Sequence, residues 1–155
     1  MKTGIDPGCP VGGIMSGGDG GSRRPVVAAA AQGGWDRVVV AFQPHRYSRT
    51  EDLWRDFGPV FDGADVVVVA DVDGAGEQPR PGITGQLVVD AVRAARPALD
   101  VRYEPDRRAL ADHLAGVLRP GDLCLTLGAG DVTGVPDELL RRLADADDRG
   151  AGGGA

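Results

Sequence analysis

Short apolar runs separated by longer amphipathic segments make up most of the chain. Residues 38–42 (VVVAF), 65–71 (DVVVVAD) and 123–127 (LCLTL) are continuously apolar or nearly so. Such runs predict strands that are buried on both faces, which is typical of a parallel sheet. A fourth segment, residues 100–104 (DVRYE), alternates between apolar and polar positions and predicts a further strand.

The segments between these runs have helical spacing. They predict helices at 25–32, from Ser48 to about 61, at 84–96, from Pro105 to 118 and from Pro136 to about 144. Ser48 and Glu51 have the S-x-x-E spacing of a capping box, and Pro59 should kink or end the helix that follows. The expected inner faces are Leu53, Trp54, Phe57, Val60 and Phe61; Leu87, Val88, Ala91, Val92 and Ala95; and Leu110, Leu114, Val117 and Leu118.

Strands that alternate with helices predict an α/β fold. We expect a Rossmann-like, mostly parallel sheet with helices on both faces, because each crossover is right-handed. Ligands of such sheets bind beyond the carboxyl ends of the strands. Three predicted loops lie there, at 43–47, 72–81 and 128–134, and they are the expected place for function.

Glycine is concentrated at the two ends of the chain. Of the 25 glycines, 8 lie in residues 1–21 and 4 in residues 150–155. Glycine-rich segments without periodicity favour flexible structure. The sequence therefore predicts an irregular segment at 1–24, one domain at 25–144 and a flexible tail at 145–155.

Charge and cysteine content narrow the class of protein. The net charge is −6, which argues against general nucleic-acid binding, but 16 of the 17 basic residues are arginine, the side chain suited to forked recognition of carboxylate or phosphate. No apolar run reaches the length of a membrane span and no signal peptide is apparent. Cys9 and Cys124 do not form a disulfide framework, so we expect no bridge and a cytoplasmic location.

The loop after the first strand offers an anion site. His45, Arg46 and Arg49 precede or begin a predicted helix, whose N-terminal N–H groups and dipole favour negative charge. The two arginines could clamp a carboxylate by bidentate hydrogen bonds. Alternatively they pair on the surface with Asp52 or Asp56, and His45 is a solvated loop residue.

The other two loops carry carboxylates and glycines. Asp71, Asp73 and Glu77 could bind a ribose hydroxyl, an amine or Mg²⁺ through water, or they form a solvated acidic turn. The third loop, 128–134 (GAGDVTG), allows close backbone approach to a ligand. Its last glycine, Gly134, is one position late for the dinucleotide fingerprint, which disfavours NAD binding.

Outside the loops the sequence offers little chemistry. His113 lies on a predicted apolar helix face and is interpreted as a structural residue, and Trp35 and Trp54 as packing residues. The chain has no nucleophile elbow, no zinc-protease motif and no G-x-x-x-x-G-K-[ST] phosphate loop. It therefore has no visible means of activating ATP alone, and no metal site is expected.

Three motifs in order suggest a family. FQPHRYSRT (42–50), DxxxAGE (71–77) and TLGAGD (126–131) resemble the C-terminal domain of Mur ligases, most closely of those that join L-alanine to UDP-N-acetylmuramate. The resemblance covers about residues 35–143. It implies an enzyme of three domains that phosphorylates the muramyl carboxylate with Mg-ATP, after which the alanine amine displaces phosphate to form an amide.

The resemblance also implies roles for the loops. Arg46 and Arg49 would hold the alanine carboxylate, whereas His45 with Gly128, Gly130 and Asp131 would lie on the nucleotide side. Asp71 and Glu77 would belong to the acidic loop. The domain itself would deliver the amino acid and close over the nucleotide.

This sequence also departs from the family pattern at several points. The phosphate loop and the sugar-binding domain are missing from this sequence. The family's D-D-Y-x-H-H-P segment is matched only by 19–25 (DGGSRRP), with Arg23 and Arg24 in the histidine places, and Asp73 stands where the acidic loop usually has tyrosine.

Three hypotheses follow. The first is a detached Mur ligase C-terminal domain from a split or truncated enzyme of peptidoglycan synthesis. Inactive alone, it would bind neither ATP nor Mg²⁺ stably and would use L-alanine and ATP together with the missing domains in trans. The second is a non-enzymatic ligand-binding or interaction module with the same fold. The third is an independent nucleotide-binding enzyme of Rossmann type.

Overall fold

The computed structural model describes residues 3–4, 13–17 and 23–152. They form one six-stranded sheet in the order β1-β2-β6-β3-β4-β5. All neighbouring strands are parallel except β1, which pairs antiparallel with β2. The strands are β1 (Thr3–Gly4), β2 (Gly13–Gly17), β3 (Val38–Phe42), β4 (Val66–Ala70), β5 (Asp100–Glu104) and β6 (Leu123–Leu127).

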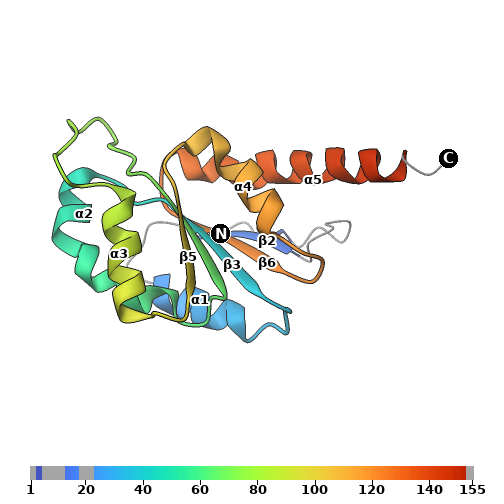
Figure 1. Cartoon of the computed structure of the whole chain (residues 1–155), viewed down its shortest axis with the longest axis horizontal. Helices are drawn as coiled ribbons and strands as arrows, with labels where there is room; N and C mark the ends of the chain where they lie inside the picture. The colour runs from blue at the N-terminus through green and yellow to red at the C-terminus, as the bar shows by residue number, and fades with distance from the viewer. Residues whose placement is uncertain (1–2, 5–12, 18–22, 153–155) are drawn as a thin grey trace.

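Helices cover both faces of the sheet, as predicted (Figure 1). One face packs against α1 (Arg23–Ala31), α2 (Tyr47–Leu53), the 3-10 helix η1 (Trp54–Phe61) and α3 (Gly85–Ala95). The other face packs against α4 (Leu110–Val117) and α5 (Val135–Ala151). Two short 3-10 helices, η2 (Arg107–Ala109) and η3 (Asp131–Gly134), precede α4 and α5.

The continuous apolar runs reflect these two covered faces. In β3, Val38, Val40 and Phe42 enter one hydrophobic core, while Val39 and Ala41 enter the other. The Phe42 ring lies 5.1 Å from that of Phe57 and 5.4 Å from that of Phe61, measured between ring centroids. Because both faces are dry, apolar side chains are needed at every position of the strand.

The strand order creates a switch point between β3 and β6. The chain moves outward from β3 to β4 and β5, and then returns to place β6 on the opposite side of β3. Helices on the outward path lie on one face, and α4 on the return path lies on the other, as right-handed crossovers require. Ligands of open α/β sheets bind at such a switch point, here between the loops that follow β3 and β6.

The structure adds elements on the N-terminal side that the sequence did not reveal. The segment 1–24 was expected to be irregular, but it contains β1 and β2 and the start of α1 at Arg23. The pairing of β2 with β6 uses backbone hydrogen bonds, which explains why a glycine-rich segment without an apolar pattern can form a strand. The other residues of this segment, including Cys9 and the DGGS part of the tenuous histidine-motif match, lie outside the described residues.

The helix that follows β3 also differs from expectation. The α-helical part ends at Leu53, and a 3-10 helix continues through Pro59 to Phe61. The 3-10 form keeps Phe57 and Phe61 in the core while accommodating the proline. The helix predicted from Pro105 likewise begins as η2 at Arg107 and becomes α-helical at Leu110.

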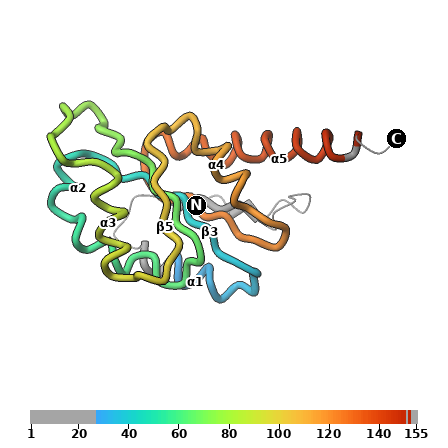
Figure 2. Tube along the Cα trace, viewed as in Figure 1, coloured from blue at the N-terminus to red at the C-terminus, as the bar shows by residue number. Residues whose placement is uncertain are grey.

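The last helix is longer than predicted. It was expected to end near Ala144, but α5 continues to Ala151 and extends beyond the rest of the fold (Figures 1 and 2). Acidic residues in its first turn and Arg149 in its last turn complement the helix dipole. From residue 144 to residue 150 the helix is exposed, so core packing does not hold this part. No helix among the described residues is long and apolar enough to cross a membrane.

Candidate functional site

The three loops predicted to carry function are joined to one another. The Arg46 N–H donates to the Asp73 carbonyl at 2.7 Å, and the Asp73 N–H donates to the Pro44 carbonyl at 2.9 Å. The Gln43 N–H extends the pairing toward β6 by donating to the Leu127 carbonyl at 3.1 Å. The loops after β3, β4 and β6 thus form one surface at the switch point.

Gln43 is a central residue of this surface that sequence reasoning missed. Its side chain is buried, accepting a hydrogen bond from the Val132 N–H at 3.0 Å and donating one to the Asp71 carbonyl at 3.4 Å. Gln43 therefore contacts all three loops. A polar residue directly after a fully apolar strand was the available signal, because a buried amide needs partners on several sides.

The glycines of the third loop permit a close approach between the loops themselves. Gly128 has φ 141°, and a Cβ there would lie 2.7 Å from the Gln43 carbonyl oxygen. Gly130 has φ 87°, and a Cβ there would overlap the Asp73 carboxylate. That carboxylate also accepts a hydrogen bond from the Asp131 N–H at 3.3 Å. Asp73 therefore joins the acidic loop to the glycine loop.

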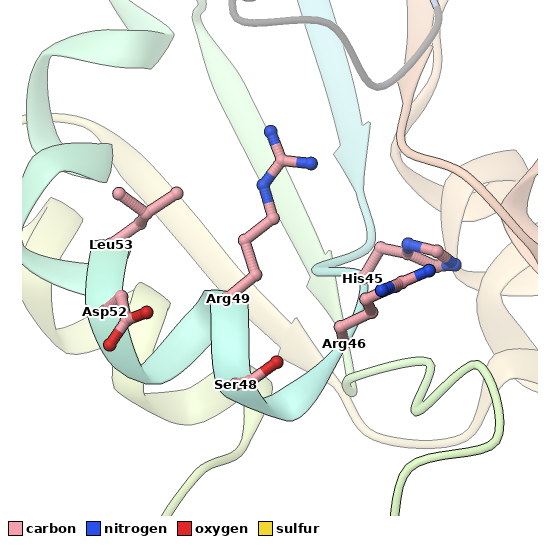
Figure 3. Close-up of a pocket in the computed structure, with 6 residues that line it drawn as sticks. All are labelled: His45, Arg46, Ser48, Arg49, Asp52 and Leu53. Atoms are coloured by element: carbon pink, nitrogen blue, oxygen red, sulfur yellow. The ribbon is translucent and has the colours of Figure 1, made fainter.

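A pocket of about 410 Å³ opens beside the loop that follows β3 (Figure 3). The residues that line it are His45, Arg46, Ser48, Arg49, Asp52 and Leu53. The pocket thus contains all three basic residues predicted for an anion site. In Figure 3 the Arg46 side chain extends toward the same side as the His45 ring, whereas Arg49 rises from α2 in another direction.

Neither pocket arginine forms an ion pair with a described residue. The surface pairing of Arg46 or Arg49 with Asp52 or Asp56, the alternative interpretation, is absent from the described part of the chain. Ion pairs do form at other arginines, namely Arg37, Arg80, Arg96, Arg102, Arg107 and Arg142, although several described arginines outside the pocket also lack an acidic partner. No described carboxylate therefore neutralises the two pocket guanidinium groups.

The backbone of Arg46 is strained. It is one of two described non-glycine residues with positive φ, at φ 69° and ψ 130°. Its N–H is held by Asp73, and its carbonyl accepts hydrogen bonds from the Thr50 N–H at 3.1 Å and the Thr50 hydroxyl at 2.8 Å. Such conformations persist only where neighbours enforce them, and they cluster at functional sites.

The N-terminus of α2 is not open to a ligand, which corrects one prediction. Its Ser48 N–H and hydroxyl donate to the Glu77 carboxylate at 3.0 and 2.5 Å. The expected capping box does not form, because α2 begins at Tyr47 and Ser48 lies inside the helix; Glu51 pairs with Arg80. Glu77 belongs to the loop that runs past α2 in Figure 2, so this loop supplies the anion at the helix end. Ligand anions must then be bound by side chains.

The contact with Ser48 lowers the pKa of the Glu77 carboxyl group, through the side-chain and backbone hydrogen bonds. A group whose pKa is lower in the folded state stabilises the fold above its unfolded pKa and loses that effect as pH falls through the folded pKa. We therefore expect Glu77→Gln to flatten the acid limb of the thermal stability profile. Melting temperatures of the wild type and the variant between pH 3 and 7 measure this, and parallel acid limbs would contradict it.

Asp71 has a structural role in this fold rather than a place in the pocket. Its Oδ1 accepts hydrogen bonds from the Val72 and Gly85 N–H groups, both at 2.9 Å, and so caps the start of α3. Burial, followed by the nearby Asp71 charge and a hydrogen bond to it, raises the pKa of Tyr103 to about 12. The carboxylate predicted to bind a ribose or an amine is thus already engaged by the protein.

The structure also shows the surroundings of the other residues that the sequence analysis discussed. Among the described residues no group of three or more His, Cys, Asp or Glu side chains gathers to hold a metal ion. His113 is partly buried and contacts Glu104 at 3.1 Å, in line with a structural residue. Trp54 packs at the edge of a core with the Arg55 guanidinium 4.3 Å above its ring. Cys124 is buried in β6.

The fold and the joined loops define an α/β domain with an arginine-lined pocket beside the loop after β3 and the start of α2. A family model described as "Mur ligase, glutamate ligase domain" matches residues 22–130. The chain therefore belongs to the Mur ligase family, through its C-terminal, glutamate ligase domain.

Curated relatives of the chain include alanine ligases. The chain is 49% identical over 117 residues to the UDP-N-acetylmuramate–L-alanine ligase of Rubrobacter xylanophilus, covering 76% of this chain and 26% of the relative. It is 50% identical over 117 residues to the ligase of the same name from Mycolicibacterium smegmatis, covering 76% and 23%. The chain thus spans about a quarter of the length of the relatives it matches.

Solved structures share the fold. The UDP-N-acetylmuramate–alanine ligase of Thermotoga maritima superimposes with a TM-score of 0.57 at 20% identity, over 80% of this chain and 24% of that chain. A murein peptide ligase of Psychrobacter arcticus gives a TM-score of 0.54 at 16% identity, over 84% and 27%. These matches support the Rossmann-like architecture described above.

Proposed function

We propose that this chain is the amino-acid-delivering C-terminal domain of a UDP-N-acetylmuramate–L-alanine ligase of peptidoglycan synthesis. The observation that carries the proposal is the pocket that holds Arg46 and Arg49 without acidic partners among the described residues. Identity of about 50% to alanine ligases supports the choice of substrate. A cytoplasmic location follows from the same proposal.

In this proposal Arg46 and Arg49 bind the carboxylate of L-alanine. Guanidinium groups suit this task because they stay charged and offer paired donors. His45 and the loop with Gly128, Gly130 and Asp131 face the nucleotide across the switch point. Asp71 and Glu77 act within the protein, by capping α3 and α2 and thereby fixing the loops around the pocket.

Mg-ATP supplies the energy of the reaction in the parent family, by transferring its γ-phosphoryl group to the substrate carboxylate. The described residues gather no metal-binding group, and the sequence contains no phosphate loop. We therefore infer that the nucleotide and its metal are held mainly by other domains of the ligase. The 155-residue chain alone should not turn over.

A chimeric enzyme tests this proposal. In the Mycolicibacterium smegmatis ligase, the segment that matches this chain is replaced by the corresponding residues of this chain. We expect ADP release that depends on both L-alanine and UDP-N-acetylmuramate, and none from the 155-residue chain by itself. A folded chimera without alanine-dependent ADP release would contradict the proposed function. Turnover by the 155-residue chain alone would contradict the expectation that it is inactive without the other domains.

Calorimetry separates the alternative of a binding module. L-Alanine and ATP are titrated into the 155-residue chain, with Arg46→Ala and Arg49→Ala as matched variants. Ligand binding that depends on the arginines, combined with an inactive chimera, favours a non-enzymatic ligand-binding domain. Binding that both variants leave unchanged would argue against the arginine clamp.

A further inference from the structure

The backbone around Asp131, in the glycine loop, is held by three side chains from different parts of the chain. Its N–H donates to Asp73 at 3.3 Å, and the next N–H, that of Val132, donates to the Gln43 side chain at 3.0 Å. Its carbonyl oxygen accepts two hydrogen bonds from Arg107, from Nη2 at 2.6 Å and from Nε at 2.9 Å. The loop is therefore fixed through its peptide groups.

Arg107 is the member of this set that comes from outside the three loops. It lies in η2, directly after the edge strand β5, and none of the recognised motifs includes it. Its side chain is only 20% exposed. It thus links the segment after the edge strand β5 to the loop after β6.

The guanidinium group of Arg107 is divided between two acceptors. Besides the Asp131 carbonyl, Nη1 and Nη2 donate to the two carboxylate oxygens of Glu138 at 3.1 and 3.0 Å. Glu138 lies in the first turn of α5, and its pKa is lowered chiefly by the hydrogen bond from Arg107. The ion pair to α5 therefore fixes the direction in which the remaining N–H groups point toward the loop.

We propose that Arg107 is a positioning residue for the nucleotide side of the site, acting through the Asp131 carbonyl oxygen. Glu138 orients the guanidinium group, and the guanidinium group holds the glycine loop against the loops after β3 and β4. This inference rests on the proposed function, which places the nucleotide beside the glycine loop. Lysine cannot replace arginine here, because a single ammonium group does not match the forked geometry of both acceptors.

The first test is made on the 155-residue chain by amide chemical shifts. We expect Arg107→Ala and Arg107→Lys to shift the amide signals of residues 128–132, with a smaller shift for Glu138→Gln. The matched control is Arg108→Ala, which removes the same charge from an exposed neighbour. Unchanged signals in a folded Arg107 variant would overturn the proposal, and Arg107→Lys serves if Arg107→Ala does not fold.

The second test uses the chimeric ligase and separates positioning from a structural role. We expect Arg107→Lys to raise the KM for Mg-ATP about tenfold while kcat changes less than twofold, and Arg108→Ala to change neither. An unchanged KM for Mg-ATP in a chimera whose glycine-loop amides have moved would overturn the link to the nucleotide. If the unmutated chimera is inactive, the proposed function fails, and the amide signals still decide whether Arg107 positions the loop.

Discussion

Gly85→Ala is expected to lower the free energy of unfolding by about 3 kcal/mol, since overpacking a rigid contact costs roughly this amount. Gly85 is the first residue of α3 and is buried. A Cβ at this position would collide with the Ala70 carbonyl oxygen at the end of β4 and would lie 2.9 Å from the Tyr103 ring. Backbone cannot give way as a flexible side chain can, so α3 must move away from the sheet.

Movement of α3 would also disturb the candidate site. The Gly85 N–H donates to Asp71, which directly follows β4 at the start of the acidic loop. Urea unfolding of the variant measures the loss in stability, with Gly116→Ala as the control. Gly116 is exposed in α4, and a Cβ there meets nothing within 4 Å, so this change should stabilise by about 0.5 to 1 kcal/mol. A loss below about 0.5 kcal/mol for Gly85→Ala would contradict the close-contact argument.

The sheet and its covering layers could be predicted because they follow from local patterns. Continuous apolar runs identified β3, β4 and β6, and helical spacing identified α3 and the inner face of α4. The strand β2 could not be found in this way. It is added at the edge of β6 by backbone hydrogen bonds, which glycine-rich sequences form without leaving an apolar signature.

The candidate site was predictable only in part. The carboxyl ends of parallel strands lie at one edge of a sheet, so the loops that follow them lie together. This rule correctly predicted the grouping of the loops at 43–47, 72–81 and 128–134. Which polar groups face a ligand does not follow from spacing, because the protein's own groups compete for the same partners. Glu77 and Asp71 were both candidate ligand-binding residues, yet Glu77 caps α2 and Asp71 caps α3.

The capping of α2 could not be predicted from sequence spacing either. Ser48 and Glu51 have the spacing of a capping box, but α2 begins at Tyr47, which places Ser48 inside the helix. The carboxylate that satisfies the first turn then comes from Glu77, 29 residues further along the chain. A contact between residues so far apart in sequence leaves no local pattern, so only the tertiary structure reveals it.

Arg46 allows charge and backbone strain to be separated by experiment. We expect Arg46→Ala and Arg46→Gly each to lower kcat/KM for L-alanine in the chimeric ligase about 100-fold, the equivalent of one charge-assisted carboxylate contact. The two variants should differ in stability. Glycine adopts a φ of 69° without strain, so Arg46→Gly should be about 1 kcal/mol more stable to urea than Arg46→Ala.

Arg49→Ala is the matched control, because it removes the second pocket guanidinium from a helical position with ordinary backbone angles. It should reduce activity without the difference in stability between alanine and glycine that Arg46 shows. Equal stability of Arg46→Gly and Arg46→Ala would mean that position 46 stores no strain. A stabilised and still active Arg46→Gly would mean that Arg46 does not bind the substrate, and the carboxylate site would then have to be sought at Arg49 and His45. The strain at Arg46 is therefore informative whichever residue binds alanine, because Asp73 in the loop after β4 and Thr50 in α2 hold the Arg46 backbone beside the pocket.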